Sequence, residues 1–250
     1  MKNKILLFYL STIKGDGLAF DRFRWIKKNL PKTNNQLLLD VGCGKGAFSI
    51  YASLKGYNCL GLTWDEKDKR EAETNTKKLN LNNCNFEVQD VRELNKRKDL
   101  FNKFDLILCT ENIEHIIDDK KLMKSMNLCL KKNGKLLLTT PSKDYIPLGK
   151  GDAGPFKEIE DGRHVRKGYF EKDLRDLCNV SNFKVLKIDF YGGYCGQKIT
   201  KIYRIISKVS SKLAAITVLP LKLLLNHLDN LITEKLNWPK YSICLTAEKN

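Results

Sequence analysis

The sequence is poor in the residues that build metal centres and disulfide frameworks. It has three histidines in 250 residues, and its eight cysteines are scattered without a CxxC pair. Several of these cysteines lie inside apolar runs, which is typical of reduced, buried thiols in a cytosolic protein. We therefore predict reduced cysteines and no structural metal.

The sequence also lacks an uncharged apolar run of the roughly 18 to 20 residues that a membrane-spanning helix needs. The segment from Met1 to Ile13 combines two lysines with the short apolar stretch Ile5 to Leu10, so a signal peptide is one interpretation. No small-residue cleavage site follows this stretch, which favours an N-terminal helix that packs on the domain.

Acidic residues are few in comparison with basic ones. The 45 lysines and arginines against 29 aspartates and glutamates leave a net charge of +16, which favours an anionic partner such as a phosphate, a nucleic acid or an acidic membrane. The alternative is a Lys- and Asn-rich composition spread over a solvated surface. With 42% hydrophobic residues the chain can bury a substantial core, so we predict a single domain over residues 1–250.

Short apolar runs alternate with helix-like stretches through the first part of the chain. This alternation predicts a parallel, doubly wound α/β sheet whose ligand lies outside the carboxyl ends of the strands. The predicted strands are Gln36 to Val41, Asn58 to Leu62, Asn85 to Gln89, Phe104 to Cys109 and Lys135 to Thr140, and the predicted helices are Ala19 to Asn29, Ala47 to Leu54, Glu66 to Leu79 and Lys120 to Leu130.

The second part of the chain departs from this alternation. The stretch Pro141 to Gly168 has no clear periodicity, and a loop of this length is usually functional or disordered. A helix at Phe170 to Asn179 and a strand at Phe183 to Tyr191 follow, and the chain finishes with a strand at Tyr241 to Glu248. A helical insertion, Gly192 to Lys240, lies between these last two strands.

A glycine-rich turn stands between the first strand and the helix that follows it. Leu37 to Gly46 reads LLLDVGCGKG, and its glycines let the backbone come close to a ligand that a Cβ would exclude. A dinucleotide site is the obvious competitor. However, the spacing is GxGxG rather than GxGxxG, and the second strand ends in Leu62 and Thr63 rather than in an acid that would hold an NAD ribose.

This stretch closely resembles motif I of class I S-adenosylmethionine-dependent methyltransferases. The resemblance implies a Rossmann-like sheet of seven strands with the last strand antiparallel, S-adenosyl-L-methionine as the cofactor, and a cofactor loop formed by Asp40, Gly42, Cys43, Gly44 and Gly46.

Three later segments resemble the family's motifs in the correct order. FEVQDV implies that Asp90 accepts a hydrogen bond from the adenine amino group, with Val91 beside it. FDLILCTENIEHI is similar to the fourth-strand motif, which implies that Thr110 and Glu111 line the cofactor and puts Glu114 and His115 in the place of a frequent Glu-His pair. LKKNGKLLLTTP, Leu130 to Pro141, matches the turn and fifth strand.

The end of the second strand departs from the family pattern. Most members carry an acid for the ribose hydroxyls where this chain has Thr63, and GLTWDEKD rather resembles the GLT-type turn of cyclopropane-synthase-like members. The Thr63 hydroxyl can still make one hydrogen bond, and Trp64 can pack on adenine. We expect Asp65 to cap the next helix.

Histidine is the natural general base if the acceptor is a hydroxyl. His115 follows the fourth strand, and His164 lies in the long loop within Arg163-His164-Val165-Arg166; the alternatives are a capping or packing role for His115 and a solvated position for His164. Glycan-modifying methyltransferases often carry a similar His-Xaa-Arg before a Tyr. This resemblance implies that Arg163, Arg166 and Tyr169 contact the acceptor, where the arginines suit a phosphate or carboxylate.

The insertion carries an apolar stripe flanked by basic residues. Residues Gly192 to Lys240 contain eight basic and two acidic residues, a balance of +6. Such a segment either lies in a membrane interface or forms a cap whose stripe packs over the domain. The stripe is Ile199, Ile202, Ile206, Val209, Leu213 and Ile216, and the flanking residues are Lys201, Arg204, Lys208 and Lys212.

Three functional hypotheses follow. The leading one is an O-methyltransferase for a small molecule, a sugar or a lipid-linked saccharide, located in the cytoplasm and at the inner face of the membrane if the insertion binds lipid. Nucleic-acid methylation is an alternative, although CTENIEH lacks the Asn-Pro-Pro-aromatic element typical of amino-group base methylation. A catalytically silent, membrane-associated protein with this fold is the third.

Overall fold

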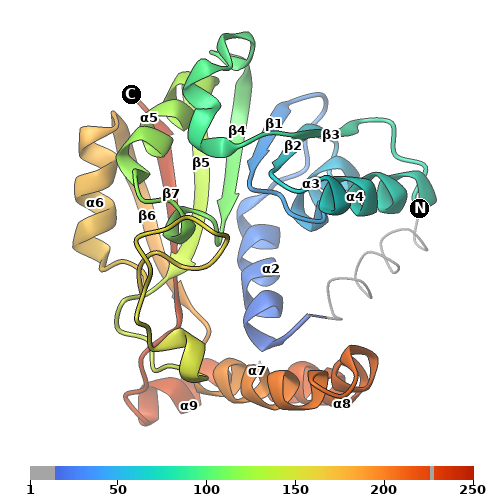
Figure 1. Ribbon diagram of the computed structural model, residues 1–250, viewed down its shortest axis with the longest axis vertical. Coiled ribbons are helices and arrows are strands. Elements are labelled where there is room, and N and C mark those ends of the chain that lie inside the picture. The colour runs from blue at the N-terminus through green and yellow to red at the C-terminus, as the bar shows by residue number, and fades with distance from the viewer. Residues whose placement is uncertain (1–14, 226–227) are drawn as a thin grey trace.

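The computed structural model describes residues 15–225 and 228–250 of the chain. The N-terminal helix expected within Met1 to Ile13 lies outside these residues. The helices therefore begin with α2 in the labels of Figure 1.

One seven-stranded sheet organises the molecule, in the order β3-β2-β1-β4-β5-β7-β6. β7 runs antiparallel to both of its neighbours, and the other pairs are parallel. This arrangement confirms the predicted doubly wound sheet with an antiparallel last strand. The strands are β1 (Leu37–Val41), β2 (Asn58–Thr63), β3 (Cys84–Val88), β4 (Phe104–Thr110), β5 (Leu130–Pro141), β6 (Phe183–Tyr191) and β7 (Ser242–Lys249).

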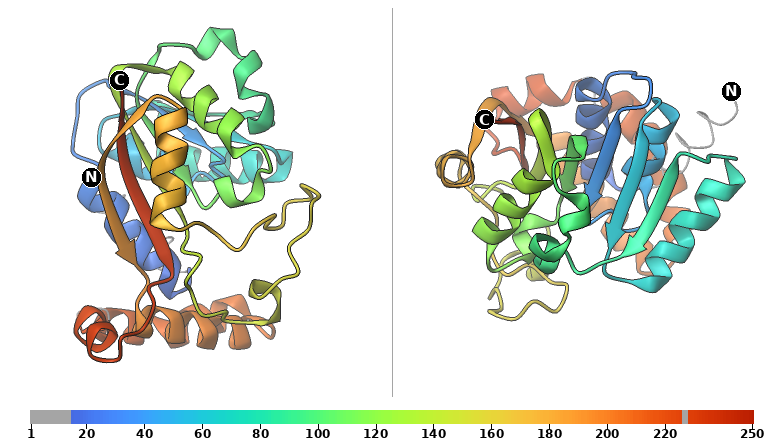
Figure 2. Two further views of the ribbon diagram at one scale, coloured as in Figure 1. Left: turned by 90° about the vertical axis from the view of Figure 1, so that its left-hand side faces the viewer. Right: turned by 90° about the horizontal axis from the view of Figure 1, so that it is seen from above.

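Helices cover both faces of the sheet, as Figure 2 shows from two further sides. Successive residues of β1 point to opposite faces: Leu38 packs with α2 and α3, whereas Leu39 packs with α5 and α6. Both residues are fully buried, so each face of the sheet has its own core. These helices are α2 (Gly17–Asn29), α3 (Ala47–Leu54), α4 (Glu66–Lys78), α5 (Asp119–Cys129) and α6 (Glu171–Val180).

β5 begins earlier than the sequence predicts. Leu130 pairs with Phe104, and the register then shifts, so that Lys135 pairs with Leu106. The intervening residues include Asn133, whose φ is 61°, and form an irregularity in the ladder. Because this added segment is polar, the apolar pattern placed the start of the strand at Lys135.

The segment from Ser142 to Gly168, hereafter the lid, runs across the carboxyl edge of the sheet between β5 and α6 (Figure 2). Its regular structure is the short 3-10 helix η4 (Lys150–Asp152). Two contacts fix its ends: Ser142 forms a bridge with Tyr169, and the Val165 amide donates to the Glu114 carbonyl over 3.0 Å. The lid is therefore an ordered cover over this edge.

The segment between β6 and β7 forms a helical layer of α7 (Tyr194–Ser207), α8 (Ser211–Leu225) and α9 (Asp229–Lys235) beneath the sheet (Figure 1). α7 lies directly against the start of α2. A Cβ added to Gly17 would lie 2.5 Å from the Gly196 carbonyl oxygen, so only glycine allows this approach of the two backbones.

Candidate cofactor and acceptor site

The glycine turn after β1 leaves an open cradle. Gly42 and Gly44 have φ angles of 80° and 49°, which side chains rarely adopt. A Cβ on Gly42 would lie 2.4 Å from the Asn112 side chain, whereas a Cβ on Gly44 would meet nothing nearer than an Asp68 oxygen at 4.0 Å. The space beside Gly44 is therefore free for a ligand. Gly46 also has a positive φ and forms the N-cap of α3.

Asp40 lies fully buried at the carboxyl end of β1. The Ser49 hydroxyl donates to its Oδ2 over 2.6 Å, while its Oδ1 is buried without a partner. Burial raises the pKa of this carboxyl to about 6. An unpartnered buried oxygen next to the cradle fits a ligand that brings a hydrogen-bond donor. The neighbouring Cys43 is half-buried, and burial raises the pKa of its thiol.

The three residues at the end of β2 and in the turn after it have different environments. The Thr63 hydroxyl is buried and accepts from the Asp65 amide over 3.5 Å. Trp64 is 69% exposed and faces the lid, because a Cβ on Gly162 would come within 3.4 Å of its ring. Asp65 accepts the first amides of α4, from Lys67 and Asp68, which confirms the expected N-cap.

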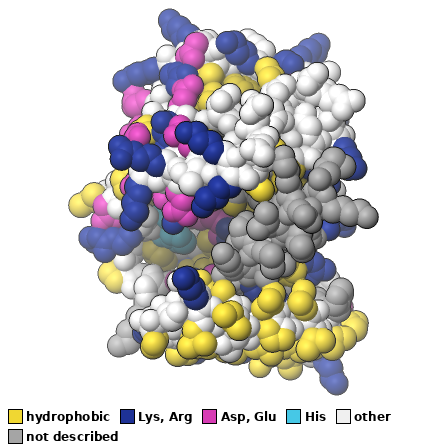
Figure 3. All heavy atoms as spheres, turned by 90° about the vertical axis from the view of Figure 1, so that its right-hand side faces the viewer, with side chains coloured by type: hydrophobic (Ala, Val, Ile, Leu, Met, Phe, Trp, Pro, Cys, Tyr) yellow, Lys and Arg dark blue, Asp and Glu magenta, His cyan; other side chains and the backbone are white. Residues whose placement is uncertain are grey.

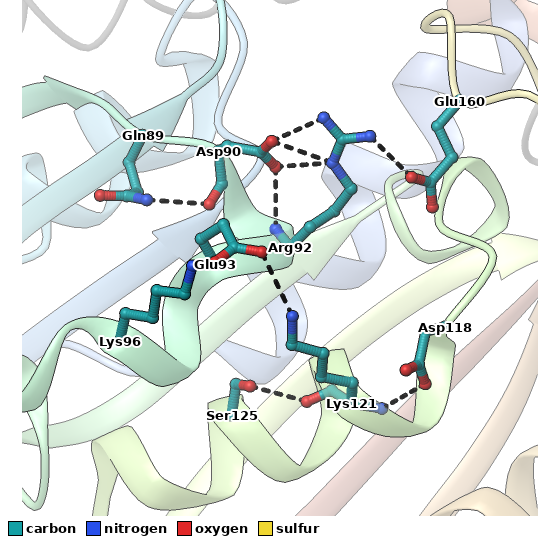
Figure 4. Close-up of polar contacts among 9 residues, drawn as sticks. All are labelled: Gln89, Asp90, Arg92, Glu93, Lys96, Asp118, Lys121, Ser125 and Glu160. Atoms are coloured by element: carbon teal, nitrogen blue, oxygen red, sulfur yellow. Dashed lines mark hydrogen bonds and ion pairs between the residues drawn. The ribbon is translucent and has the colours of Figure 1, made fainter.

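Asp90, the expected adenine acceptor, is already engaged (Figure 4). Its carboxylate accepts from the Arg92 guanidinium over 2.6 to 2.9 Å, and this pairing lowers the Asp90 pKa. Arg92 also binds Glu160 of the lid over 2.7 Å, and Glu160 accepts from the Ile117 amide. An adenine bound here, as the motif implies, would have to share the Asp90 carboxylate with Arg92. The next residue, Val91, is buried at the start of the 3-10 helix η1 (Val91–Lys96).

The end of β4 is joined to α2 by an ion pair. Thr110 is buried, and Glu111 has a φ of 48°. One Glu111 oxygen accepts from the Thr139 hydroxyl over 3.1 Å, and the other lies 3.0 Å from an Arg22 nitrogen. The Arg22 Nε is buried without a partner, so Arg22 presents a free donor at this edge. Both Glu111 oxygens are thus engaged, so this residue stabilises the site and has no free carboxylate oxygen for a ligand.

The buried Glu114 and the half-buried His115 and His164 form a cluster where the lid crosses β4. The two histidine rings meet edge to face with centroids 4.6 Å apart, and His164 Nε2 lies 4.0 Å from Glu114 Oε1. Burial and the neighbouring His115 lower the pKa of His164 to about 4. Burial and the charge of Glu111 raise the pKa of Glu114 well above its usual value. His164 is therefore neutral near pH 7, and burial favours the protonated form of Glu114.

Two polar atoms in this cluster have no partner. Glu114 Oε1 and His115 Nδ1 are buried without a hydrogen bond, although the Thr140 hydroxyl donates to the other Glu114 oxygen over 3.1 Å. One potential ligand atom from each of Glu114, His115 and His164 lies within 4.8 Å of the others, so the cluster has the spacing to hold a metal ion. The sequence did not indicate this grouping, because His164 is distant along the chain.

The residues expected to bind the acceptor occupy different environments. Arg166 donates to the Ile116 and Ile117 carbonyls and pairs with Asp119, and the buried Tyr169 hydroxyl donates to Asp119 over 2.9 Å. Both line a cavity of about 820 Å³ between the lid, α5 and α6. Their polar groups hold the lid to the sheet domain. Arg163 is exposed and pairs with Asp161 two residues earlier.

The sequence analysis missed Arg22, Arg92 and Glu160. Arg22 lies on a helix to which the sequence assigned no role, and Arg92 and Glu160 meet only because the lid folds back over β3. Nothing in their local sequence marks them. Glu114 had a signal in the Glu-His pair, but its burial and its contact with His164 depend on the lid.

An open glycine cradle and a carboxylate with one unpartnered oxygen lie where the strand order reverses, between β1 and β4. This geometry defines an enzyme of the Rossmann-like class that binds a nucleoside cofactor at the carboxyl ends of its strands. The chain belongs to the methyltransferase-domain family, whose model matches residues 19–188. It is an S-adenosylmethionine-dependent methyltransferase, as the motifs indicated.

Two relatives and one solved structure show the range of similarity. The chain is 29% identical over 182 residues to a ubiquinone biosynthesis O-methyltransferase of Pelagibacter ubique, covering 67% of this chain and 74% of the relative. A protein of the same name from Coxiella burnetii is 28% identical over 124 residues, which is about half of each chain, 50% and 51%. Phosphoethanolamine N-methyltransferase 2 of Haemonchus contortus, in complex with S-adenosyl-L-methionine, has a TM-score of 0.62 at 18% identity, covering 90% of this chain and 51% of that chain.

Proposed function

We propose that this enzyme methylates a hydroxyl oxygen of a small molecule, a sugar or a lipid-linked saccharide. The observation that carries the proposal is the pair of buried, unpartnered atoms, Glu114 Oε1 and His115 Nδ1, beside the neutral His164. Figure 3 shows histidine side chains inside a hollow between the sheet domain and the helical layer. A hydroxyl that enters this hollow satisfies both atoms, because it can donate to one and accept from the other.

The residues of the cofactor edge suit the methyl donor. Asp40 and the cradle beside Gly44 would hold its amino acid portion, and Thr63 and Asp90 would hold its nucleoside portion. When bound there, S-adenosylmethionine supplies an electrophilic methyl group. Methyl transfer to oxygen is an in-line displacement, so the protein must align the acceptor, exclude water and accept one proton.

The histidine pair is the proton acceptor in this proposal. Both rings are neutral acceptors when unprotonated, and His164 stays neutral above about pH 4. A proton gained by His164 creates an imidazolium 4.0 Å from Glu114 Oε1. The proton stays on His164, and the unpartnered Glu114 Oε1 stabilises this charge as a nearby acceptor, which offsets the weak intrinsic basicity of His164.

The comparisons support oxygen as the methylated atom, since the relatives carry the name O-methyltransferase. The saccharide acceptor rests on the resemblance of His164-Val165-Arg166 to glycan-modifying enzymes. Location in the cytoplasm at the inner face of an anionic membrane is likewise proposed, from the surface of the helical layer described below.

A labelling experiment tests this function. The protein is incubated with methyl-labelled S-adenosylmethionine and cell extract, and label is followed into low-molecular-weight, lipid, RNA and protein fractions. We expect label in a small-molecule or lipid fraction, and less of it with His115→Ala. Label confined to RNA or protein contradicts the proposal, and RNA labelling together with salt-dependent RNA binding would establish the nucleic-acid alternative.

A matched pair of variants separates chemistry from cofactor binding. His115→Ala and Lys96→Ala, an exposed lysine remote from the cluster, are compared for S-adenosylhomocysteine binding by calorimetry. We expect both to bind the product with unchanged affinity. Loss of binding in His115→Ala would place this residue in the cofactor site instead.

A further inference from the structure

The outer side of the helical layer exposes a concentrated apolar surface. Twenty large hydrophobic side chains are exposed among the described residues, and ten of them lie between residues 202 and 236. We call these ten the outer helical face, and Figure 3 shows hydrophobic side chains gathered along this layer. They are Ile202, Ile205, Val209, Leu213, Ile216, Leu223, Leu224, Leu228, Leu231 and Leu236.

The spacing of these residues shows that they share one side of each helix. On α7 they recur at steps of three and four residues, and Val209 just beyond it is 86% exposed. The expected apolar stripe is therefore only partly used for packing: Ile199 is buried, whereas Ile202, Leu213 and Ile216 face outward. One end of the stripe packs over the domain, as a cap requires, and the rest is open to a contact from outside.

The inner side of the layer is already fixed to the domain. The Thr200 hydroxyl accepts from the Leu18 amide over 3.0 Å, and the Lys222 ammonium donates to the Gly15 carbonyl. Asp229 accepts from the amides of Gly193 and Cys195, which tie α9 to the start of α7. Rotation of the helices to bury the outer helical face would break these contacts. The apolar surface therefore has to be covered from outside.

The charge around this surface is predominantly positive. Four exposed lysines border the outer helical face, and of the two acids between residues 192 and 240 Asp229 is buried and Glu234 is exposed. This surface complements an anionic layer. A symmetric contact with a second copy would instead bring the same lysines against one another. The lysines are Lys201, Lys208, Lys212 and Lys235.

The geometry suits a surface contact rather than a span. Among the residues that the structure describes, no single helix is long and apolar enough to cross a membrane, and α8 and α9 reach that measure only as a pair bent by 75°. Apolar side chains along several helices of one layer, bordered by lysines, match a protein that lies in the headgroup region.

We propose that the outer helical face docks on an anionic membrane surface. Its apolar side chains enter the headgroup boundary, and its bordering lysines bind lipid phosphates. Docking of this kind sets the histidine-lined hollow of Figure 3 just above the lipid surface. The link to a lipid-linked acceptor rests on the proposed function, whereas the docking itself does not.

Vesicle co-sedimentation of the full chain tests the proposal. Vesicles of phosphatidylcholine alone are compared with vesicles of phosphatidylcholine mixed with phosphatidylglycerol. We expect binding to the mixed vesicles that is at least roughly tenfold tighter than to the neutral ones and that weakens as salt is added. Equal binding to both kinds, or none to either, overturns the proposal.

Two pairs of variants locate the contact. Val209→Glu with Ile216→Glu should weaken binding roughly tenfold or more, whereas Val180→Glu with Leu186→Glu, two exposed positions on α6 and β6, should leave it unchanged. Lys208→Gln with Lys212→Gln should also weaken it roughly tenfold, in contrast to Lys77→Gln with Lys78→Gln on α4. Equal effects within either pair contradict the assigned surface.

Two further measurements keep the outcomes distinct. Sedimentation velocity of the wild type without lipid detects self-association, and a dimer that Val209→Glu with Ile216→Glu abolishes would mean that a second copy covers this face. Calorimetry with S-adenosylhomocysteine verifies that each variant is folded. Vesicle binding without any methylated product would count against the proposed function and leave the docking surface standing.

Discussion

The cofactor edge is formed by the ends of consecutive strands, whereas the acceptor side is formed by the lid and the helical layer. At the cofactor edge each expected functional residue lies in the last part of its strand or just after it, as Asp40 lies near the end of β1. On the acceptor side the functional contacts join distant segments, as His164 meets His115. The comparison shows that the residues expected to bind the cofactor are positioned by local sequence. The residues expected to bind the acceptor are brought together by the fold of the lid.

The largest expected effect is a loss of function at the acceptor side alone. His115→Ala should lower the rate of methyl transfer roughly 100- to 1,000-fold at unchanged cofactor affinity, because a positioned base contributes about this much. Single-turnover rates and calorimetry measure the two quantities. Equal loss of rate and affinity would remove the distinction between the two regions.

The pH profile sharpens the role of His164. Its pKa is lowered to about 4, so this group is already deprotonated across the neutral range. Its protonation should therefore produce a fall in rate only near pH 4, and not near the ordinary histidine value of about 6.5. An acid limb near 6.5 that His164→Gln removes would contradict this assignment.

The next effect breaks the cofactor edge alone. Gly44→Val forces a β-branched residue to a φ of 49° and fills the open cradle, so we expect about 100-fold weaker binding of S-adenosylmethionine. Gly149→Val is the control, since a Cβ there meets nothing within 4 Å and the φ of Gly149 is outside the left-handed region. Unchanged cofactor binding in Gly44→Val would mean that the ligand lies elsewhere.

A smaller effect concerns the seam between the two regions, where Asp21 of α2 faces the helical layer. Burial and the charge of Asp229 raise its pKa from 3.8 to about 7, so the folded state holds this proton more tightly than the unfolded state. Stability is therefore lost as pH rises toward and through 7. We expect the free energy of unfolding to fall by about 1 kcal/mol between about pH 6 and about pH 8.

Urea unfolding at these two pH values measures the change. Asp21→Asn cannot ionise and should abolish this part of the pH dependence, whereas Asp144→Asn, at an exposed position of the lid, should retain it. The same slope in wild type and Asp21→Asn would show that another group is responsible.

The smallest effect concerns the contact that links the regions across the lid. Glu160→Gln removes the ion pair with Arg92, which is partly exposed and should contribute no more than about 1 kcal/mol. We expect release of S-adenosylhomocysteine to accelerate by at most about fivefold, measured by stopped flow. Asp99→Asn, which removes the Arg97 pair on the surface, should leave release unchanged.

Most of the fold could be predicted from the sequence, because the buried strands are short apolar runs that end in glycines or turn residues. The glycine turn and Asp40 were also predictable, since both lie within one strand-turn-helix unit. The Arg92 pair with Glu160 and the Arg22 pair with Glu111 were not, because each joins segments that are distant in the sequence. The outward orientation of Ile202 and Leu213 could not be predicted either, since periodicity identifies an apolar stripe but not the surface that it faces.

The close backbone contact between Gly17 and Gly196 joins α2 to α7 of the helical layer. Arg22 lies about one and a half turns further along α2 and forms an ion pair with Glu111 at the end of β4. The side chain of Ile199 lies at the same contact. A displacement of the helical layer would therefore be passed along α2 to Glu111 at the carboxyl end of β4.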